Sequence, residues 1–285
     1  MYDLRESRFR AAPSPSHLPA ARNLTLSRRR RNVTQLKIVN ALAEARHLTV
    51  SQIAKLFYQR RLDGSAPKTP LRNVREDTYE LTPGYDSAYK LLSRMVAAKT
   101  IRRHKSGIMR GQDLYSLYSQ GKGPSPMNYE HEVACGDLYV AFQATGKVAS
   151  WATSWKPKQY ADYARAAGVN PDAMLELEGC SQVIFFEVDM GNEKYETLDH
   201  KVQKYRTLAL STSPFAVVFL FRDNALRRCS WKERAVQFND RVASKHGMGR
   251  QFSAAPHHML ATDPLGKWIA SYRSDERFSV TDLAR

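Results

Sequence analysis

Residues 183–221 read VIFFEVDMGNEKYETLDHKVQKYRTLALSTSPFAVVFLF, and this stretch decides the fold class of the chain. Residues 183–189 are rich in β-branched and aromatic side chains and predict a strand. Residues 193–209 predict a helix, and the seven apolar residues 215–221 have the length of a buried strand. A strand, a helix and a second strand in succession are typical of a sheet that is covered by helices.

The segments on either side extend this pattern over the C-terminal half of the chain. Apolar residues at helical spacing and runs rich in β-branched and aromatic residues predict four more elements. These are a helix at 129–142, strands at 147–151 and 171–178, and a helix at 230–246. We therefore expect residues 127–285 to form an α/β domain with a mixed sheet.

The N-terminal half has a different order, with three helices followed by a hairpin. Thr49 and Gln52 have the spacing of a capping box at the start of the second helix. Thr82-Pro83 places a proline near the start of the third helix. The helices are predicted at 33–45, 50–57 and 82–99, and two strands separated by Gly107 and Gly111 are predicted at 100–105 and 113–118. This order is typical of a winged helix-turn-helix, which we expect over residues 32–126.

The positive charge is concentrated in the first 126 residues. The chain carries 44 Lys and Arg against 28 Asp and Glu, a net charge of +16. Residues 1–126 hold 24 basic and 9 acidic residues, and the remainder is nearly neutral. Such an asymmetry indicates a polyanionic partner. Double-stranded DNA is favoured over an anionic membrane, because no basic amphipathic helix accompanies the charge.

Residues 1–31 are expected to form a disordered basic tail, because three prolines between 11 and 21 remove backbone donors. The tail ends in Arg28, Arg29, Arg30 and Arg31, which would contact phosphates or enter a minor groove. The alternatives are a solvated run of charge and an organellar transit peptide. A secretory signal is not expected, since no apolar segment follows the arginines.

Two surfaces of the winged helix are expected to contact DNA. The polar face of the third helix carries Ser87, Tyr89, Lys90, Ser93 and Arg94. The wing carries Arg102, Arg103 and Lys105. Helix side chains would read base edges, whereas the wing would bind phosphates. The alternative is a three-helix module that binds protein and whose charges are merely solvated.

Composition and cysteine content indicate the compartment. The chain is 42% hydrophobic and 25% charged, as in globular proteins. No run approaches the ~18 apolar residues of a membrane span. The three cysteines match no zinc or disulfide spacing and favour a reducing compartment. We therefore expect a cytoplasmic protein that has no membrane partner, and binding to DNA would place it with the nucleoid or with a plasmid.

A group of carboxylates is expected at one edge of the predicted sheet. Glu187 and Asp189 share a strand face, because side chains alternate with period two. Asp172 precedes the neighbouring strand, and Glu132 lies on the preceding helix. Such oxygens suit Mg²⁺, which polarises a phosphodiester and activates a bound water. The alternative is that they are ordinary acids at strand ends and at a helix N-terminus.

Three segments that follow the predicted winged helix in the sequence resemble those of a known family. They are Pro171-Asp172-Ala173, residues 186–193 (FEVDMGNE) and Lys201-x-x-Lys204-Tyr205. In this order they resemble the replication-relaxation family over most of residues 33–222. Proteins of that family are carried by bacterial plasmids, phages and integrative elements and are associated with replication initiation or with DNA relaxation during mobilisation.

The resemblance implies a PD-(D/E)xK nuclease-like fold for the C-terminal half. It implies that Glu132 is the helix acid and that Asp172 and Glu187 are metal ligands, with Mg²⁺ or Mn²⁺ as cofactor if the site is active. The family motif has a lysine two residues after Glu187, where this chain has Asp189. Lys201 or Lys204 would have to replace that lysine, which stabilises developing charge. Without such a replacement the domain is an inactive nuclease-like shell.

Three hypotheses follow for the function. The first is a double-stranded-DNA-binding protein of a mobile element, acting in replication initiation or mobilisation with an inactive nuclease-like domain. The second is a Mg²⁺-dependent endonuclease or nickase that uses Glu132, Asp172, Glu187 and Lys201. The third is a winged-helix transcriptional regulator whose C-terminal domain dimerises or senses a ligand. Replication or mobilisation proteins and a second copy of the chain are further candidate partners.

Overall fold

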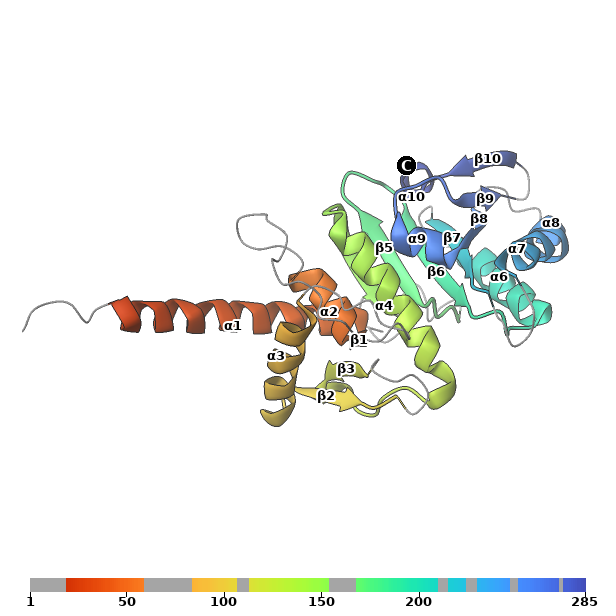
Figure 1. The fold of residues 1–285 in the computed structure, drawn as a ribbon. Coiled ribbons are helices and arrows are strands. Elements are labelled where there is room, and N and C mark those ends of the chain that lie inside the picture. The colour runs from red at the N-terminus through yellow and green to blue at the C-terminus, as the bar shows by residue number, and fades with distance from the viewer. Residues whose placement is uncertain are drawn as a thin grey trace, which may run out of the picture.

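The computed structural model describes residues 19–58, 84–106, 113–153, 168–209, 215–223, 230–246, 251–271 and 274–285; the side chains of 19–31, 242–244 and 271–276 are not described. A smaller N-terminal unit lies beside a larger sheet that is covered by helices (Figure 1). None of the helices in these ranges combines the length and apolar character needed to cross a bilayer.

The N-terminal unit contains the helices and the hairpin that the sequence predicts. Its described elements are α1 (Pro19–Ala45), β1 (Leu48–Thr49), α2 (Val50–Phe57), α3 (Tyr85–Ala97), β2 (Ile101–His104) and β3 (Leu114–Leu117). The strands form an antiparallel sheet in the order β1-β3-β2. The capping box is confirmed, since the Thr49 hydroxyl accepts from the Gln52 amide and the Gln52 side chain accepts from Thr49 N. Residues 82, 83, 107 and 111 lie outside the described ranges.

Helix α1 is longer than the sequence analysis predicts. It begins at Pro19, so residues 19–31 are helical, whereas we expected a tail up to residue 31. Proline is tolerated in the first helical turn, where its missing N–H would have no partner. The alanines and arginines that follow have high helix propensity and continue the helix. Figure 1 shows α1 projecting from the rest of the protein.

The C-terminal sheet is mixed, as predicted. In the described chain it has seven strands in the order β10-β9-β8-β7-β6-β5-β4, of which β6, β7 and β8 are parallel. The strands are β4 (Val148–Thr153), β5 (Ala173–Leu177), β6 (Val183–Asp189), β7 (Phe215–Phe221), β8 (Phe252–Pro256), β9 (Ile269–Ser271) and β10 (Ser274–Phe278). The antiparallel strands at both edges therefore flank a parallel centre.

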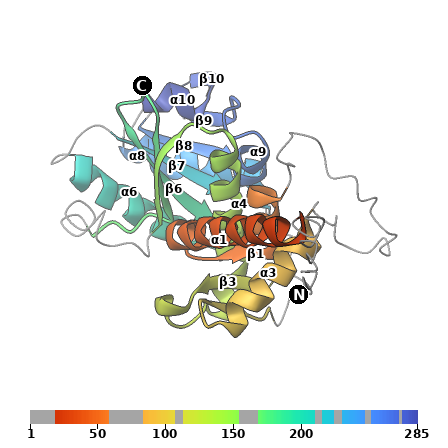
Figure 2. The same cartoon turned by 90° about the vertical axis from the view of Figure 1, so that its left-hand side faces the viewer.

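Helices cover both faces of this sheet (Figure 2). They are α4 (Tyr129–Ala144), α6 (Tyr195–Ala209), α7 (Trp231–Phe238), α8 (Ser244–His246), α9 (His257–Thr262) and α10 (Val280–Ala284). Along β6, Ile184, Phe186 and Val188 pack in the core with α4, whereas Phe185 packs in the core with α6 and α7. The helix predicted at 230–246 consists of α7, one π-helical turn at Asn239–Ala243 and α8.

The two units share one apolar core on the α4 side of the sheet. Buried residues of α1, α2 and α3 belong to the same cluster as those of α4 and the strands. Polar contacts reinforce this seam, because Gln52 Nε2 donates to Val133 O at 2.9 Å and to Asp137 Oδ1 at 2.8 Å. Gly136 permits the approach, since a Cβ there would lie 2.7 Å from Gln52 Oε1.

Candidate functional site

Asp172 lies at the junction of the α4 face and the sheet. Its backbone N–H donates to Phe186 O at 3.0 Å, which fixes the residue at the start of β5 beside β6. Its Oδ2 accepts from Val188 N at 2.7 Å and lies 3.2 Å from His131 Nε2. The carboxylate is therefore held by one backbone donor and one imidazole.

Glu187 is buried on the opposite face of β6, where α6 supplies both of its partners. Tyr205 donates its hydroxyl to Oε1 at 2.6 Å, and Lys201 Nζ lies 2.8 Å from Oε2. Lys201 and Tyr205 are four residues apart and so share one helix face. Lys201 also donates to Glu193 Oε1 at 2.8 Å. Lys201 thus bridges two carboxylates.

The two carboxyl groups titrate differently because their environments differ. Burial would raise the pKa of Asp172, but the hydrogen bond and charge of His131 lower it below its ordinary value. Burial and the neighbouring Asp172 carboxylate raise the pKa of Glu187 to about 7, although Lys201 and Tyr205 oppose this shift. Despite burial, the carboxylates around Lys201 raise its pKa. Near pH 7 Asp172 is therefore ionised and Glu187 is about half protonated, beside the Lys201 ammonium.

Asp189 stands where the nuclease motif has lysine, and the structure gives it another role. Its Oδ2 accepts from Arg234 Nε at 2.6 Å in a buried ion pair. Its Oδ1 accepts from the backbone N–H of Gly191 at 2.9 Å and from the two residues after it. Asp189 therefore fastens the turn after β6 to α7. The sequence offered no signal for Arg234, because the pair spans 45 positions.

Glu132 does not join Asp172 and Glu187, contrary to the sequence prediction. Its carboxylate lies 3.2 Å from Arg46 Nη1 and 2.8 Å from His47 Nδ1, in the seam with the N-terminal unit. On an α-helix, adjacent side chains point about 100° apart, so His131 faces Asp172 when Glu132 faces away. These ion pairs lower the pKa of Glu132 although it is buried.

The predicted three-carboxylate metal site is therefore not assembled. In the described part of the chain, no group of three or more His, Cys, Asp or Glu side chains is arranged to hold a metal ion. Both oxygens of Glu187 and one oxygen of Asp172 already have partners. The residues present do not fit the metal centre that the resemblance implied. What they form is a partly buried acid–lysine cluster: His131, Asp172, Glu187, Glu193, Lys201 and Tyr205.

The residues predicted to contact DNA on α3 lie on one solvent-exposed face. Ser87, Tyr89, Lys90, Ser93 and Arg94 are exposed, whereas Ala88, Leu91, Leu92 and Met95 are buried. Arg94 Nε donates to Lys90 O at 3.1 Å, which directs the guanidinium along the helix. This face is polar and basic, and Tyr89 also contacts β2, where Arg103 Nη1 donates to its hydroxyl at 3.5 Å.

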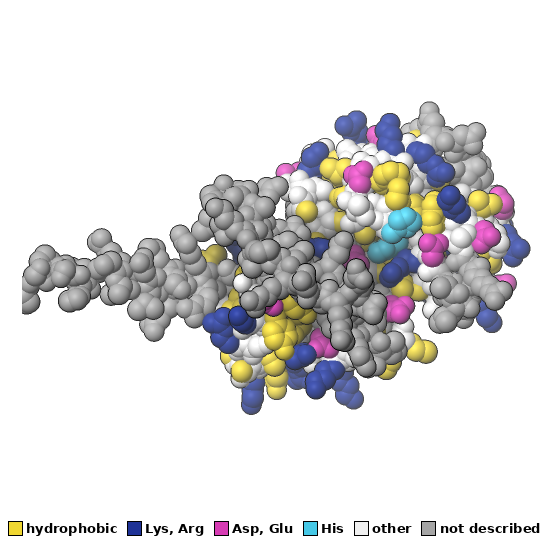
Figure 3. All heavy atoms as spheres, viewed as in Figure 1, with side chains coloured by type: hydrophobic (Ala, Val, Ile, Leu, Met, Phe, Trp, Pro, Cys, Tyr) yellow, Lys and Arg dark blue, Asp and Glu magenta, His cyan; other side chains and the backbone are white. Residues whose placement is uncertain are grey.

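The predicted wing residues have different surroundings. Lys105 is exposed, and the Arg102 guanidinium lies over the Tyr118 ring, 4.2 Å from its centroid. Arg103 forms an ion pair with Asp113, directly before the facing strand β3, which partly neutralises it. Figure 3 shows Lys and Arg side chains gathered where Figure 1 places α3 and β2. Residues 28–31 lie in α1, and their side chains are not described.

These features define a class: mixed α/β proteins in which an N-terminal helical unit with an exposed basic helix is joined to a sheet with a partly buried acid–lysine cluster. The sequence model of the replication-relaxation family matches residues 39–216, and the chain belongs to that family. The resemblance found in the sequence is thereby confirmed. No curated protein and no solved structure matches the chain. Membership associates the protein with replication or relaxation of plasmids or other mobile elements.

Proposed function

We propose that the protein binds double-stranded DNA of a bacterial mobile element, in replication initiation or mobilisation, and that its nuclease-like domain does not cleave. The exposed basic face of α3 carries the proposal. Lys90 and Arg94 occupy this face beside a hairpin, in the order of elements of a winged helix-turn-helix. In that fold the corresponding helix enters the major groove.

The charge distribution supports the same partner. The first 126 residues hold nearly all of the net charge of +16. Each phosphate that a protein neutralises contributes about −0.9 to the slope of log K against log salt. Lys105 adds an exposed charge beside the helix, whereas Arg103 contributes less because Asp113 pairs with it.

The acid–lysine cluster supports the absence of cleavage. Hydrolysis of a phosphodiester by this type of fold requires carboxylate oxygens that are open to a metal ion. Here the Glu187 oxygens are paired with Lys201 and Tyr205, and Glu132 forms ion pairs at the contact between the two units. Asp189 is committed to Arg234. On this proposal, the domain contributes to assembly of the complex with DNA rather than to cleavage.

The test is duplex binding by the full chain, because the shared core makes an isolated N-terminal fragment an unsuitable probe. We expect a steep salt dependence for the wild-type protein. Arg94→Ala should weaken the preferred site by about tenfold or more and weaken random duplex less, since a bidentate base contact contributes ~1–3 kcal/mol. Lys147→Ala, an exposed lysine after α4, is the matched control. A flat salt dependence, or equal losses on both duplexes, would refute the proposal.

One observation favours a second candidate, a Mg²⁺-dependent endonuclease or nickase. Lys201 lies against Glu187 and interacts electrostatically with Asp172, which is where a replacement for the motif lysine would be needed. Plasmid nicking in Mn²⁺ that disappears in both Asp172→Ala and Glu187→Ala would establish this activity. Nicking that survives both substitutions would identify a contaminant.

A further inference from the structure

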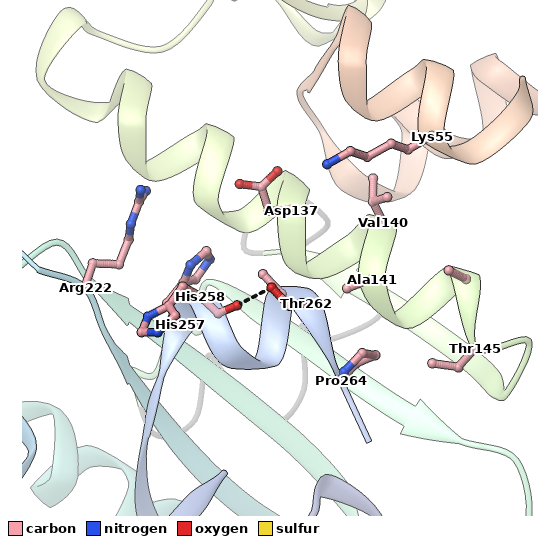
Figure 4. A pocket seen from close by; sticks show the side chains of 12 residues that line it. Lys55, Asp137, Val140, Ala141, Thr145, Arg222, His257, His258, Thr262 and Pro264 are labelled. Carbon is pink, nitrogen blue, oxygen red and sulfur yellow. Dashed lines mark hydrogen bonds between the residues drawn. The ribbon is translucent and has the colours of Figure 1, made fainter. Parts of the chain in front are cut away.

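A cleft opens between the two units. Its volume is about 560 Å³, within the range of pockets that bind small molecules. Lys55 of α2, Asp137 of α4 and His258 of α9 line it, together with Arg222 at the end of β7 (Figure 4). The N-terminal unit and the sheet therefore both contribute to its walls.

The position of the cleft follows from the topology of the sheet. Arg222 directly follows β7, and His257 directly follows β8. Because β7 and β8 are parallel, both residues lie at the carboxyl edge of the sheet. In open α/β sheets, ligands bind in the crevice outside the carboxyl ends of the strands.

The charged groups of the cleft favour an anion. Among the described residues, neither Lys55 nor Arg222 forms an ion pair within 4.0 Å, and both act on the single carboxylate of Asp137. Figure 4 shows Lys55 and Arg222 on opposite sides of Asp137. Burial raises the pKa of Asp137 despite these cations and Gln52. Two cations therefore face one carboxylate.

The remaining walls favour an organic group attached to that anion. Val140 and Ala141 of α4 and Pro264 after α9 line the cleft with apolar atoms. His257 is buried, and burial lowers its pKa to about 4, so its ring is neutral. Its Nε2 lies 2.9 Å from Ala134 O, to which the neutral ring donates. A small inorganic anion would make no contact with these apolar side chains.

We propose that this cleft binds a nucleoside phosphate, with the phosphates contacted by Lys55 and Arg222 and the nucleoside against α4 and α9. The combination of two cations from different elements, an apolar wall and a nucleotide-sized volume carries this assignment. The site is separate from the basic face of α3, so it stands or falls independently of DNA binding. Occupation would also link α2 to the sheet through the ligand.

The experiment titrates the full-length protein with ATP, AMP, inorganic phosphate and adenosine, using calorimetry and thermal denaturation. We expect ATP to raise the denaturation temperature and to bind more tightly than phosphate or adenosine. Lys55→Met and Arg222→Met should each weaken ATP about tenfold or more, because each removes a charge-assisted contact. Ala144→Trp, at the exposed rim, should block binding by filling the cleft.

Lys37→Met removes an exposed lysine of α1 and should leave ATP affinity unchanged. Equal affinity for ATP and inorganic phosphate would overturn the nucleoside assignment. Wild-type ATP affinity in both Lys55→Met and Arg222→Met would overturn the site, as would a lack of ATP binding. A duplex that competes for the cleft, with ATP inert, would assign it to the DNA surface instead.

Discussion

Gly136→Ala tests whether the seam between the two units is as tight as the structure shows. Alanine in place of glycine normally stabilises a helix interior by about 1 kcal/mol. At position 136 the new Cβ would lie 2.7 Å from Gln52 Oε1 and 2.8 Å from Nε2, so the Gln52 amide must move. That amide accepts from Thr49 N and donates to Val133 O and Asp137 Oδ1. Moving the amide would therefore break three hydrogen bonds, each of which contributes about 1 kcal/mol.

The net effect should be a destabilisation of about 2 kcal/mol, measured as the free energy of unfolding in urea. In a Gln52→Ala background the clash disappears, and Gly136→Ala should become stabilising by about 1 kcal/mol. The resulting coupling of about 3 kcal/mol is at the upper end for residues in contact. Ser93→Ala, an exposed helix position on α3, controls for helix propensity alone. Stabilisation by Gly136→Ala in both backgrounds would refute the reasoning.

Three further predictions concern the sheet and the acid–lysine cluster. Arg234→Met leaves Asp189 buried without its cation and should lower the free energy of unfolding in urea by ~3–5 kcal/mol. The side chain of Lys245 is 58% exposed, so Lys245→Met should lower it by at most ~1 kcal/mol. Similar losses in both variants would contradict the burial argument. Because the folded pKa of Glu187 is about 7 against 4.5 for an exposed glutamate, the folded state binds more protons between these values, and its stability falls as pH rises through that interval. Glu187→Gln should remove this decline, and an unchanged ratio of urea midpoints at pH 5 and pH 8 would rule out the titration. Tyr205→Phe removes the donor to Glu187 Oε1 and should cost ~1–3 kcal/mol by the same assay; wild-type stability of Tyr205→Phe would show that the hydrogen bond is not made.

The sequence predicted the elements that carry strong local signals. The strand at 183–189 has the bounds given by its β-branched and aromatic composition, and the apolar run 215–221 is fully buried as β7. The helix predicted between them at 193–209 agrees with α6 to within two residues. Residues 252–284 carry short strands and short helices without clear periodicity, so β8, β9, β10, α9 and α10 were not predicted.

In the candidate site, the sequence predicted correctly only those side-chain positions that the alternation of a strand determines. Period-two alternation correctly placed Glu187 and Asp189 on one face, the face that α6 and α7 cover. The sequence does not show how α4 is rotated about its axis. We therefore predicted that Glu132 faces the sheet, whereas in the structure His131 does. The cationic partners of Asp189 and of Glu132 lie tens of residues away in the sequence, and only tertiary packing brings them together.

The shared core has a consequence for exchanging parts between relatives. Residues 32–126 cannot be treated as an interchangeable cassette, because their removal would expose Ala134, Leu138 and Tyr139 on α4. It would also leave Glu132 without Arg46 and His47. A functional chimera would therefore have to transplant the matching surface of α4 along with the N-terminal unit. Recombination between mobile elements is then expected to tolerate crossovers after α4 better than crossovers at residue 126.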